Sequence, residues 1–384
     1  MIRRRVQRHL TDRLAAYPAV ALIGPRQCGK TTLAQSLGGV YFDLEQESER
    51  LRLDLGWDEI AAGKDLVILD EAQSWPAVFA RLRGAIDQDR QRMSRFLLLG
   101  SVSPSLMVRV SESLAGRLSL VELTPFLSTE LKAKASRDRH WLCGGYPDGG
   151  VLKPKQYPRW QLDYLALLTQ RDLPSWGLAA KPQTTDRLLR MLAAWHGQTW
   201  NASQVGQSLG LSYQTVNSYL DYLAGAFLIR RLPPYRANIQ KRLVKSPKVY
   251  WRDSGLLHAL LNVPDERVLL AQPWVGASWE GFVIEQALGE LTSRGRSFDA
   301  YYLRTSDQYE LDLVLDFGTE RWAVEVKLSS SPAPEDMRRL DKTADMIDAS
   351  RRFLVSQASR SSGDERRVSC NLRSFLAYLR ESGS

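Results

Sequence analysis

Residues 18–33 read Pro-Ala-Val-Ala-Leu-Ile-Gly-Pro-Arg-Gln-Cys-Gly-Lys-Thr-Thr-Leu, an apolar run that leads into the spacing Gly-x-x-x-x-Gly-Lys-Thr. The apolar residues 20–23 predict a buried strand. Gly24 and Gly29 allow the backbone N–H groups between them to turn inward around phosphate oxygens. A helix that begins near Lys30 directs the positive end of its dipole at the same anion. The stretch therefore predicts a phosphate-binding loop in an α/β sheet, built to hold a nucleoside triphosphate.

The side chains of this loop have the chemistry that binding of ATP and Mg²⁺ requires. Lys30 is expected to reach the β- and γ-phosphates, and the Thr31 hydroxyl is expected to bind Mg²⁺. The predicted nucleotide-binding residues of the loop are Gly24, Pro25, Arg26, Gln27, Cys28, Gly29, Lys30, Thr31 and Thr32. A chance match is the alternative, but the apolar strand before the loop and the helix-compatible residues after it argue against chance.

Two further apolar runs end in polar residues that suit the same site. Residues 65–73, Asp-Leu-Val-Ile-Leu-Asp-Glu-Ala-Gln, predict a central parallel strand whose carboxyl end carries Asp70 and Glu71. We expect Asp70 to hold Mg²⁺ through water and Glu71 to polarise the attacking water. Residues 96–99 predict a third strand, and Ser101 after it is a candidate sensor of the γ-phosphate. The alternatives are a solvated helix start for Asp70 and Glu71, and a helix N-cap for Ser101.

The composition is typical of a protein with several domains in a reducing compartment. A length of 384 residues predicts two or three domains. The three cysteines are odd in number and far apart, so they predict neither a disulfide framework nor a zinc site, and the expected location is the cytoplasm. No apolar run approaches the roughly 18 residues of a membrane span, so no membrane partner is expected. The basic residues 1–10 could mimic an organellar presequence, but the strand expected from residue 20 favours an amphipathic helix.

Residues 181–252 have the pattern of a winged helix-turn-helix, in which three helices are followed by a strand and a loop. The helices and the strand are expected at residues 188–195, 201–210, 213–223 and 227–229. In the third helix Gln214, Thr215, Asn217 and Ser218 are expected to face a DNA groove. A winged helix that contacts other proteins is the alternative.

The stretch from Arg230 to Arg252 strengthens the case for DNA. It holds eight basic residues, no acidic residue and several aromatic residues, and the whole chain carries a formal net charge of +9. Such a run is typical of a loop that faces nucleic acid, more than of a surface with balanced charge. DNA is therefore the expected partner of this segment.

Residues 309–328 predict a β-hairpin that turns at Gly318-Thr319. On one face of the hairpin Asp312 lies across from Glu325, and Glu310 lies across from Lys327. Directly opposed carboxylates destabilise a sheet unless a cation lies between them, and Mg²⁺ accepts such a pair. The opposite, buried face is expected to consist of Leu311, Leu313, Leu315, Trp322, Val324 and Val326. The hairpin therefore predicts a metal site.

The residue types around that hairpin suit the chemistry of a metal-dependent nuclease. Glu280 on a preceding helix would add a carboxylate to the metal ligands Asp312 and Glu325. Lys327 lies on the same face as Glu325 and would orient or deprotonate water. This Asp…Glu-x-Lys set resembles the core of restriction-endonuclease-like nucleases. The alternative is a surface hairpin with an ordinary ion pair between Glu310 and Lys327.

Several motifs outside the phosphate-binding loop support a family resemblance. They are Leu69-Asp70-Glu71-Ala72-Gln73, Ser113-Leu114-Ala115-Gly116-Arg117, Gly144-Gly145-Tyr146-Pro147, Arg171-Asp172-Leu173, Asp253-Ser254-Gly255-Leu256 and Glu325-Val326-Lys327. Over nearly its whole length the chain resembles the prokaryotic AAA-type ATPases that carry a C-terminal domain of unknown function with a restriction-endonuclease-like core. The resemblance implies an AAA+ ATPase that forms a homo-oligomeric ring, with Arg117 as the arginine finger. Relatives often have Thr before Gly100, where this chain has Leu99.

The expected fold is therefore α/β with three domains. A P-loop AAA+ domain with a parallel sheet and a helical lid is expected at residues 1–180, a winged helix-turn-helix at 181–252 and a restriction-endonuclease-like domain at 253–384. Three functions fit this arrangement. The first is an ATP-driven machine that handles DNA, the second is an ATP-dependent switch that contacts proteins, and the third is a metal-dependent nuclease whose access ATP controls.

Overall fold

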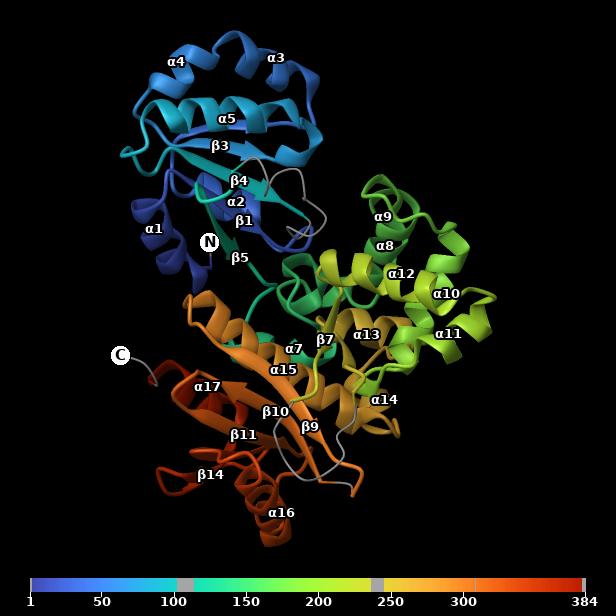
Figure 1. Ribbon diagram of the computed structural model, residues 1–384. Helices are drawn as coiled ribbons and strands as arrows, with labels where there is room; N and C mark the ends of the chain where they lie inside the picture. The colour runs from blue at the N-terminus through green and yellow to red at the C-terminus, as the bar shows by residue number, and fades with distance from the viewer. Residues whose placement is uncertain (1, 102–113, 236–244, 308, 382–384) are drawn as a thin grey trace. The chain divides into compact units, whose positions relative to one another are not determined.

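The computed structural model of the chain describes residues 2–101, 114–235, 245–307 and 309–381 (Figure 1). The chain divides into two compact units. Unit 1 comprises Met1–Phe126 with the short segments Gly225–Phe227 and Thr292–Gly295, and unit 2 comprises the remaining residues. Among the described residues, no helix is long and apolar enough to cross a membrane.

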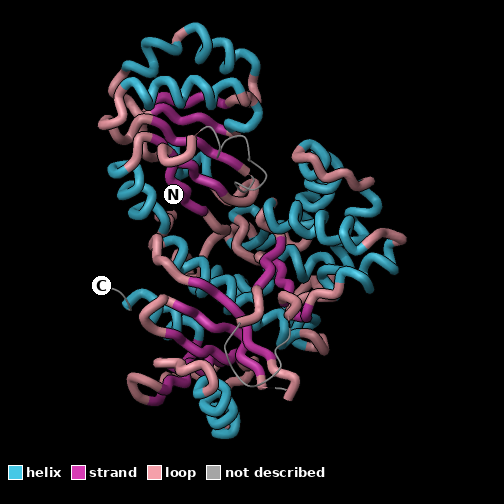
Figure 2. The backbone as a smooth tube through the Cα atoms, viewed as in Figure 1, coloured by secondary structure: helices cyan, strands magenta, loops and turns pink. Residues whose placement is uncertain are grey.

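Unit 1 is built on a five-stranded sheet, whose strands are magenta in the upper part of Figure 2. The strand order is β2-β3-β4-β1-β5, and every neighbouring pair of strands is parallel. Its elements are α1 (Val6–Ala16), β1 (Ala19–Ile23), α2 (Lys30–Gln35), β2 (Val40–Asp43), α3 (Glu47–Leu55), α4 (Trp57–Ala62), β3 (Val67–Asp70), η1 (Ala72–Ser74), α5 (Ala77–Gln88), β4 (Phe96–Gly100) and β5 (Leu118–Glu122). Parallel pairing brings the carboxyl ends of β1, β3 and β4 to one edge of the sheet.

Helices cover both faces of this sheet, which explains why its central strands are continuous apolar runs. All residues of β1, β3 and β4 are buried. Leu10 of α1 and Leu33 of α2 pack with Val20 and Leu22 of β1 on one face. Figure 1 shows α5 on the opposite face. The predictions of a buried strand before the loop, a helix that begins at Lys30 and an amphipathic N-terminal helix are confirmed.

The first part of unit 2 is mainly helical and ends in a small antiparallel sheet in the order β6-β8-β7. Its elements are α7 (Lys134–Cys143), η2 (Pro147–Val151), η3 (Pro154–Gln156), α8 (Arg159–Leu167), η4 (Leu168–Asp172), α9 (Leu173–Ser175), α10 (Pro182–Ala194), β6 (Gln198–Thr199), α11 (Ala202–Leu209), α12 (Tyr213–Gly225), β7 (Ile229–Leu232) and β8 (Lys248–Trp251). Asn201 Oδ1 accepts a hydrogen bond from Gln204 N at the start of α11, and Ser212 Oγ accepts one from Thr215 N at the start of α12. Three helices thus lie where the sequence predicts them.

The second part of unit 2 is a six-stranded mixed sheet in the order β13-β14-β12-β11-β10-β9. Its elements are α13 (Ser254–Leu260), α14 (Glu266–Leu270), α15 (Val275–Ser293), β9 (Asp299–Arg304), β10 (Glu310–Asp316), β11 (Arg321–Val326), α16 (Pro334–Asp345), β12 (Arg351–Ser356), β13 (Ser362–Gly363), β14 (Arg367–Asn371) and α17 (Leu372–Glu381). Residues of α15 and α17 pack on one face of this sheet, and residues of α16 pack on the other.

The hairpin of β10 and β11 differs from its prediction at one residue. Its predicted register is confirmed, because Leu313 pairs with Val324 and Leu315 pairs with Trp322. The pairing of β10 with β9, however, shifts between Leu311 and Val314. Such an irregularity turns one residue to the other face, so Leu311 packs toward α16 while Leu313 packs toward α15. The prediction that Leu311 shares a face with Leu313 is therefore wrong.

Two of the sequence motifs meet in unit 2 and have a structural role. Asp253 Oδ2 accepts a hydrogen bond from Gly145 N at 2.7 Å, and Asp253 Oδ1 accepts one from Leu256 N at 3.0 Å. Burial raises the pKa of the Asp253 carboxyl to about 6. A Cβ on Gly255 would lie 2.0 Å from the carbonyl oxygen of Cys143. Only glycine fits at this contact, which joins α13 to the end of α7.

We expect Gly255→Ala to destabilise the protein, because the added methyl group collides with rigid backbone. The loss should be about 1–3 kcal/mol in the free energy of unfolding. Gly276→Ala in α15 is the matched control, since a Cβ there meets nothing within 4 Å. It should leave stability unchanged or raise it slightly. Urea denaturation followed by tryptophan fluorescence measures both, and equal stabilities of the two variants would contradict the proposed close contact.

Candidate functional site

The loop between β1 and α2 closes tightly at its two glycines. Gly24 has φ +154°, and a Cβ there would lie 2.1 Å from the carbonyl oxygen of Leu123. Gly29 has φ +100° and forms the N-cap of α2. Arg4 supports the loop, because its buried guanidinium donates a hydrogen bond to the carbonyl oxygen of Cys28 at 2.8 Å. The sequence does not indicate this role of Arg4, because the basic residues 1–10 predict only an amphipathic helix.

Lys30 and Ser101 meet at the edge of the sheet, as the sequence predicts. The Lys30 side chain is buried, and its Nζ donates to the carbonyl oxygens of Gly24 and Pro25 at 2.9 and 3.0 Å. It also lies 3.2 Å from Ser101 Oγ. All three acceptors are neutral. A phosphate group would offer Lys30 a charged acceptor and a stronger hydrogen bond.

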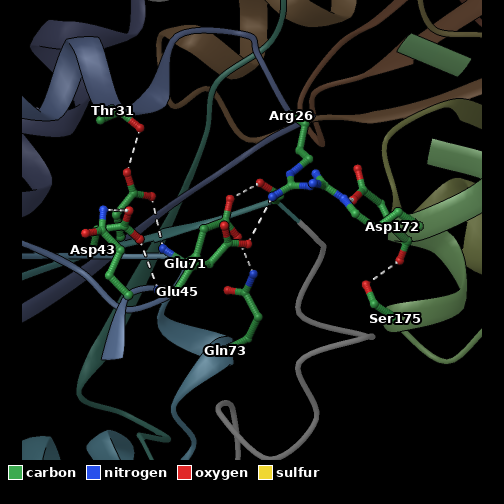
Figure 3. Close-up of polar contacts among 12 residues, drawn as sticks. Arg26, Thr31, Asp43, Glu45, Glu71, Gln73, Asp172 and Ser175 are labelled. Carbon is green, nitrogen blue, oxygen red and sulfur yellow. Dashed lines mark hydrogen bonds and ion pairs between the residues drawn. The ribbon is translucent and has the colours of Figure 1, made fainter. Parts of the chain in front are cut away.

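Asp70 is the centre of a second set of hydrogen bonds. Its Oδ2 accepts from Thr31 Oγ1 at 2.6 Å (Figure 3) and from the Tyr41 hydroxyl at 2.8 Å, while its Oδ1 accepts from Glu71 N at 3.0 Å. Burial, then the hydrogen bond to Asp70, raises the pKa of Tyr41, so Tyr41 remains a donor at ordinary pH. A hydroxyl and a carboxylate in contact are the ligand types that Mg²⁺ prefers. The residues present therefore fit the expected ion.

Glu71 is held beside Lys30 by neutral donors. Its Oε1 accepts a hydrogen bond from Ser101 Oγ at 2.5 Å, and its Oε2 accepts one from Gln73 Nε2 (Figure 3). Glu71 has φ +47°, in the left-handed region, where non-glycine residues are uncommon. Ser101 thus links the predicted water-activating carboxylate to the predicted phosphate-binding ammonium group.

The remaining loop residues are distributed around this centre. Pro25 and Cys28 are buried, Gln27 and Thr32 are exposed, and Arg26 Nη2 donates to Glu45 Oε1 at 3.0 Å (Figure 3). The helix N-cap alternative for Ser101 concerns residues after 101, which lie outside the described part of the chain.

Arg117, the expected arginine finger, forms an ion pair within unit 1. Its Nε and Nη2 donate to the two carboxylate oxygens of Asp87 at 2.9 Å each. These hydrogen bonds lower the pKa of Asp87. Asp87 also pairs with Arg90.

The structure gives partners within unit 2 to several side chains of the basic stretch from Arg230 to Arg252, for which the sequence predicts contact with DNA. Arg230 and Arg252 both bind Glu285, and Arg231 pairs with Asp221 at 2.7 Å. The side chain of Lys248 is buried, whereas Lys245 is exposed. Arg236, Lys241 and Arg242 lie outside the described residues. Arg230, Arg231 and Arg252 therefore have acidic partners within unit 2.

Two of the four predicted groove-facing residues of α12 differ in their surroundings. Gln214 is exposed, but Asn217 is half-buried, and its Oδ1 accepts a hydrogen bond from Trp200 Nε1 at 2.9 Å. The oxygen of Asn217 is thus bound within the unit, and contact of this residue with a DNA groove stays a prediction.

The predicted metal ligands of the C-terminal domain meet around Lys248. Lys248 Nζ lies 3.1 Å from Glu280 Oε1, 2.8 Å from Glu310 Oε1 and 3.9 Å from Asp312 Oδ1. Tyr250 also donates to Glu280. Sequence analysis missed Lys248 in this role, although the alternation of Lys248 and Tyr250 on a strand was a signal that both side chains share a face.

The other two members of the predicted site form a pair of their own. Lys327 Nζ lies 2.7 Å from Glu325 Oε1, and Asp312 Oδ2 accepts a hydrogen bond from Val326 N at 2.8 Å. Burial raises the pKa values of Asp312 and Glu325. In the described part of the chain, no three His, Cys, Asp or Glu side chains are arranged to hold a metal ion.

Comparison with protein families divides the chain into three segments. The model of an AAA domain matches residues 16–132. Two models described as domains of unknown function, DUF8612 and DUF4143, match residues 134–267 and 275–375.

Two solved structures illustrate the similarity to proteins of known structure. A Walker-type ATPase of Pyrococcus abyssi is 15% identical, with 68% of this chain and 96% of that chain covered and a TM-score of 0.47. A RuvB structure of Thermotoga maritima is 19% identical, with 59% and 89% covered and a TM-score of 0.31.

Whole-chain relatives occur in mycobacteria. Uncharacterized proteins of Mycobacterium tuberculosis and Mycobacterium bovis are each 38% identical over 336 residues, which is 86% of this chain and 75% of theirs. The match to an AAA domain coincides with the five-stranded parallel sheet and the phosphate-binding loop. The chain belongs to the family of these mycobacterial proteins, and its N-terminal unit is an AAA-type ATPase domain of the P-loop α/β fold.

Proposed function

We propose that the protein binds ATP with Mg²⁺ at the loop of unit 1 and hydrolyses it. The observation that carries the proposal is the hydrogen-bonded chain from Lys30 through Ser101 to Glu71, beside the pair of Thr31 and Asp70. Phosphoryl transfer depends on positioning and on charge stabilisation. These contacts bring an ammonium group, a hydroxyl and a carboxylate together at one edge of the sheet.

Each residue has a distinct role in this proposal. Lys30 exchanges neutral carbonyl acceptors for phosphate oxygens. Thr31 and Asp70 hold Mg²⁺, which when bound neutralises phosphate charge. Glu71 accepts the proton of the attacking water, since the donors that bind its carboxylate in the described part of the chain are the neutral groups of Ser101 and Gln73. Ser101 orients Glu71 relative to Lys30.

We further propose that Arg117 acts on a neighbouring copy of the chain in a homo-oligomer. The resemblance noted above supports this role. The Arg117–Asp87 pair is partly exposed, with the Arg117 side chain 24% and the Asp87 side chain 35% accessible, so solvent weakens it. In the free subunit Arg117 remains bound to Asp87, and assembly draws the guanidinium to the neighbour's γ-phosphate.

A second proposal is that unit 2 binds DNA. The element order α10-β6-α11-α12-β7-β8 supports a winged helix-turn-helix, and Gln214 is exposed on α12. The candidate phosphate contacts are Lys241, Arg242 and Lys245, because the other basic residues of this stretch within the described part of the chain have acidic partners. A protein-binding role for this segment is the competing proposal. The mixed sheet that follows supports a restriction-endonuclease-like fold for the C-terminal domain.

Substitution of Lys30 and Glu71 separates ATP binding from hydrolysis. Lys30→Ala should lose both, because its charge faces the phosphates. Glu71→Gln should bind ATP but turn it over roughly 10²–10⁴-fold more slowly, since only the proton acceptor is lost. Binding of a fluorescent ATP analogue and release of phosphate are the measurements, with the exposed Lys64→Ala and Glu59→Gln as controls. Equal loss of binding in both variants would show that Glu71 has a structural role.

Substitution of Arg117 tests assembly. Arg117→Ala should bind ATP normally and hydrolyse it about 10³–10⁵-fold more slowly, because an arginine finger acts only on the transition state. Turnover per wild-type subunit should rise with protein concentration. Arg90→Ala is the matched control, since Arg90 pairs with the same Asp87. A wild-type protein that is monomeric with ATP and fully active would refute action in trans.

Salt dependence tests DNA binding. The affinity for duplex DNA should fall steeply with salt, and replacing Lys241, Arg242 and Lys245 by Gln should flatten the log–log slope by roughly two to three units. The control replaces the exposed Lys132, Lys134 and Lys155, which changes the net charge equally. Fluorescence anisotropy at several salt concentrations gives the slopes. If no binding is measurable at low salt, the protein-binding alternative is favoured.

A further inference from the structure

Lys248 is a buried cation that joins three segments of unit 2. It lies at the start of β8 and is 3% exposed. Its ammonium group contacts Glu280 of α15 and Glu310 of β10, and lies 3.9 Å from Asp312 of β10. The Tyr302 ring of β9 lies 5.5 Å from the same nitrogen. Burial of a lysine is unfavourable unless acidic groups compensate its charge, so this arrangement is a built cluster.

The carboxylates around Lys248 include two of the three residues expected to bind a metal. Glu280 and Asp312 face Lys248, and the third, Glu325, pairs with Lys327 at 2.7 Å. Each of these acids therefore has a cation from the protein itself. Asp312 Oδ2 is also engaged by Val326 N.

A divalent ion and the Lys248 ammonium compete for the same oxygens. Mg²⁺ binds carboxylate oxygens at about 2.1 Å, and Lys248 Nζ already lies within hydrogen-bond distance of one oxygen from Glu280 and one from Glu310. An ion among these carboxylates would lie close to the positive charge of Lys248, which is buried. Repulsion between the two cations would cancel much of the binding energy.

We infer that Lys248 takes the place of the divalent ion in the C-terminal domain, so that the domain does not carry out metal-dependent cleavage of nucleic acid. Opposed carboxylates still need a compensating positive charge, and Lys248 provides it within the chain. The cluster then serves to hold β8 against α15 and β10. This inference is independent of ATP hydrolysis in unit 1.

Mn²⁺ binding to the full chain tests this inference. Thr31→Ala and Asp70→Asn are combined first, to remove the ligands expected in unit 1, and free Mn²⁺ is measured by electron paramagnetic resonance. In this background the protein should show no Mn²⁺ site. Adding Lys248→Met keeps the side-chain length without the charge and should create one Mn²⁺ site. This site should bind Mn²⁺ at least roughly tenfold more tightly than the background protein does.

Three further variants make the result specific. Adding Glu280→Gln to the Lys248→Met protein should abolish the new site. Lys245→Met, at an exposed lysine, should create none. Lys248→Arg keeps the charge and should also create none. Lys248→Met should lower the melting temperature in EDTA, and Mn²⁺ should restore it, because the ion replaces the missing charge.

Two results would overturn the inference. One is a folded Lys248→Met protein that gains no Mn²⁺ site. The other is a Mn²⁺ site in the starting background that disappears with Asp312→Asn. If Lys248→Met does not fold even with Mn²⁺, the comparison of the starting background with its Asp312→Asn variant decides. Both of these proteins retain Lys248.

Discussion

Two buried lysines set the chemistry of the two units, because an ammonium group removed from water must be surrounded by oxygen atoms. Lys30 meets this requirement with two backbone carbonyls and one hydroxyl. Lys248 meets it with carboxylates. Neutral acceptors leave the charge of Lys30 available to a polyanion, whereas the charge of Lys248 is already compensated. The same constraint therefore produces an anion site in one unit and a closed ionic cluster in the other.

The sequence predicts those features that depend on neighbouring residues. The buried strand, the glycines of the loop and the helix start at Lys30 are encoded within sixteen consecutive residues, residues 18–33. The hairpin register follows from its turn, because strand pairing about a fixed turn allows one alignment of the apolar residues. Leu311 falls outside this rule because β10 carries an extra residue in its pairing with β9: Leu311 pairs with Leu303, but Val314 pairs with Tyr301.

The sequence does not predict partners that are distant along the chain. Arg230 and Arg252 are part of a run without acids, yet both bind Glu285. Asn217 has the right spacing for a groove-facing residue, but Trp200 occupies its oxygen. In the sequence, Tyr41 shows only that it is an aromatic residue of a strand. Parallel pairing places β2 beside β3, and the Tyr41 hydroxyl then donates a hydrogen bond to Asp70. Charge and spacing alone therefore overestimate how much polar surface is free to bind a ligand.

The contrast between the two lysines also bears on how the units divide the work. A nucleotide can alter the contacts of Lys30 and Glu71, because these contacts are with neutral groups that exchange at little cost. The cluster around Lys248 has no such freedom, since opening it would leave a buried charge unpaired. The closed cluster around Lys248 therefore agrees with a C-terminal domain that binds a partner. It agrees less well with a domain in which a divalent ion cleaves nucleic acid. Of the three functions that the sequence allowed, the two in which unit 2 acts by binding agree with this chemistry.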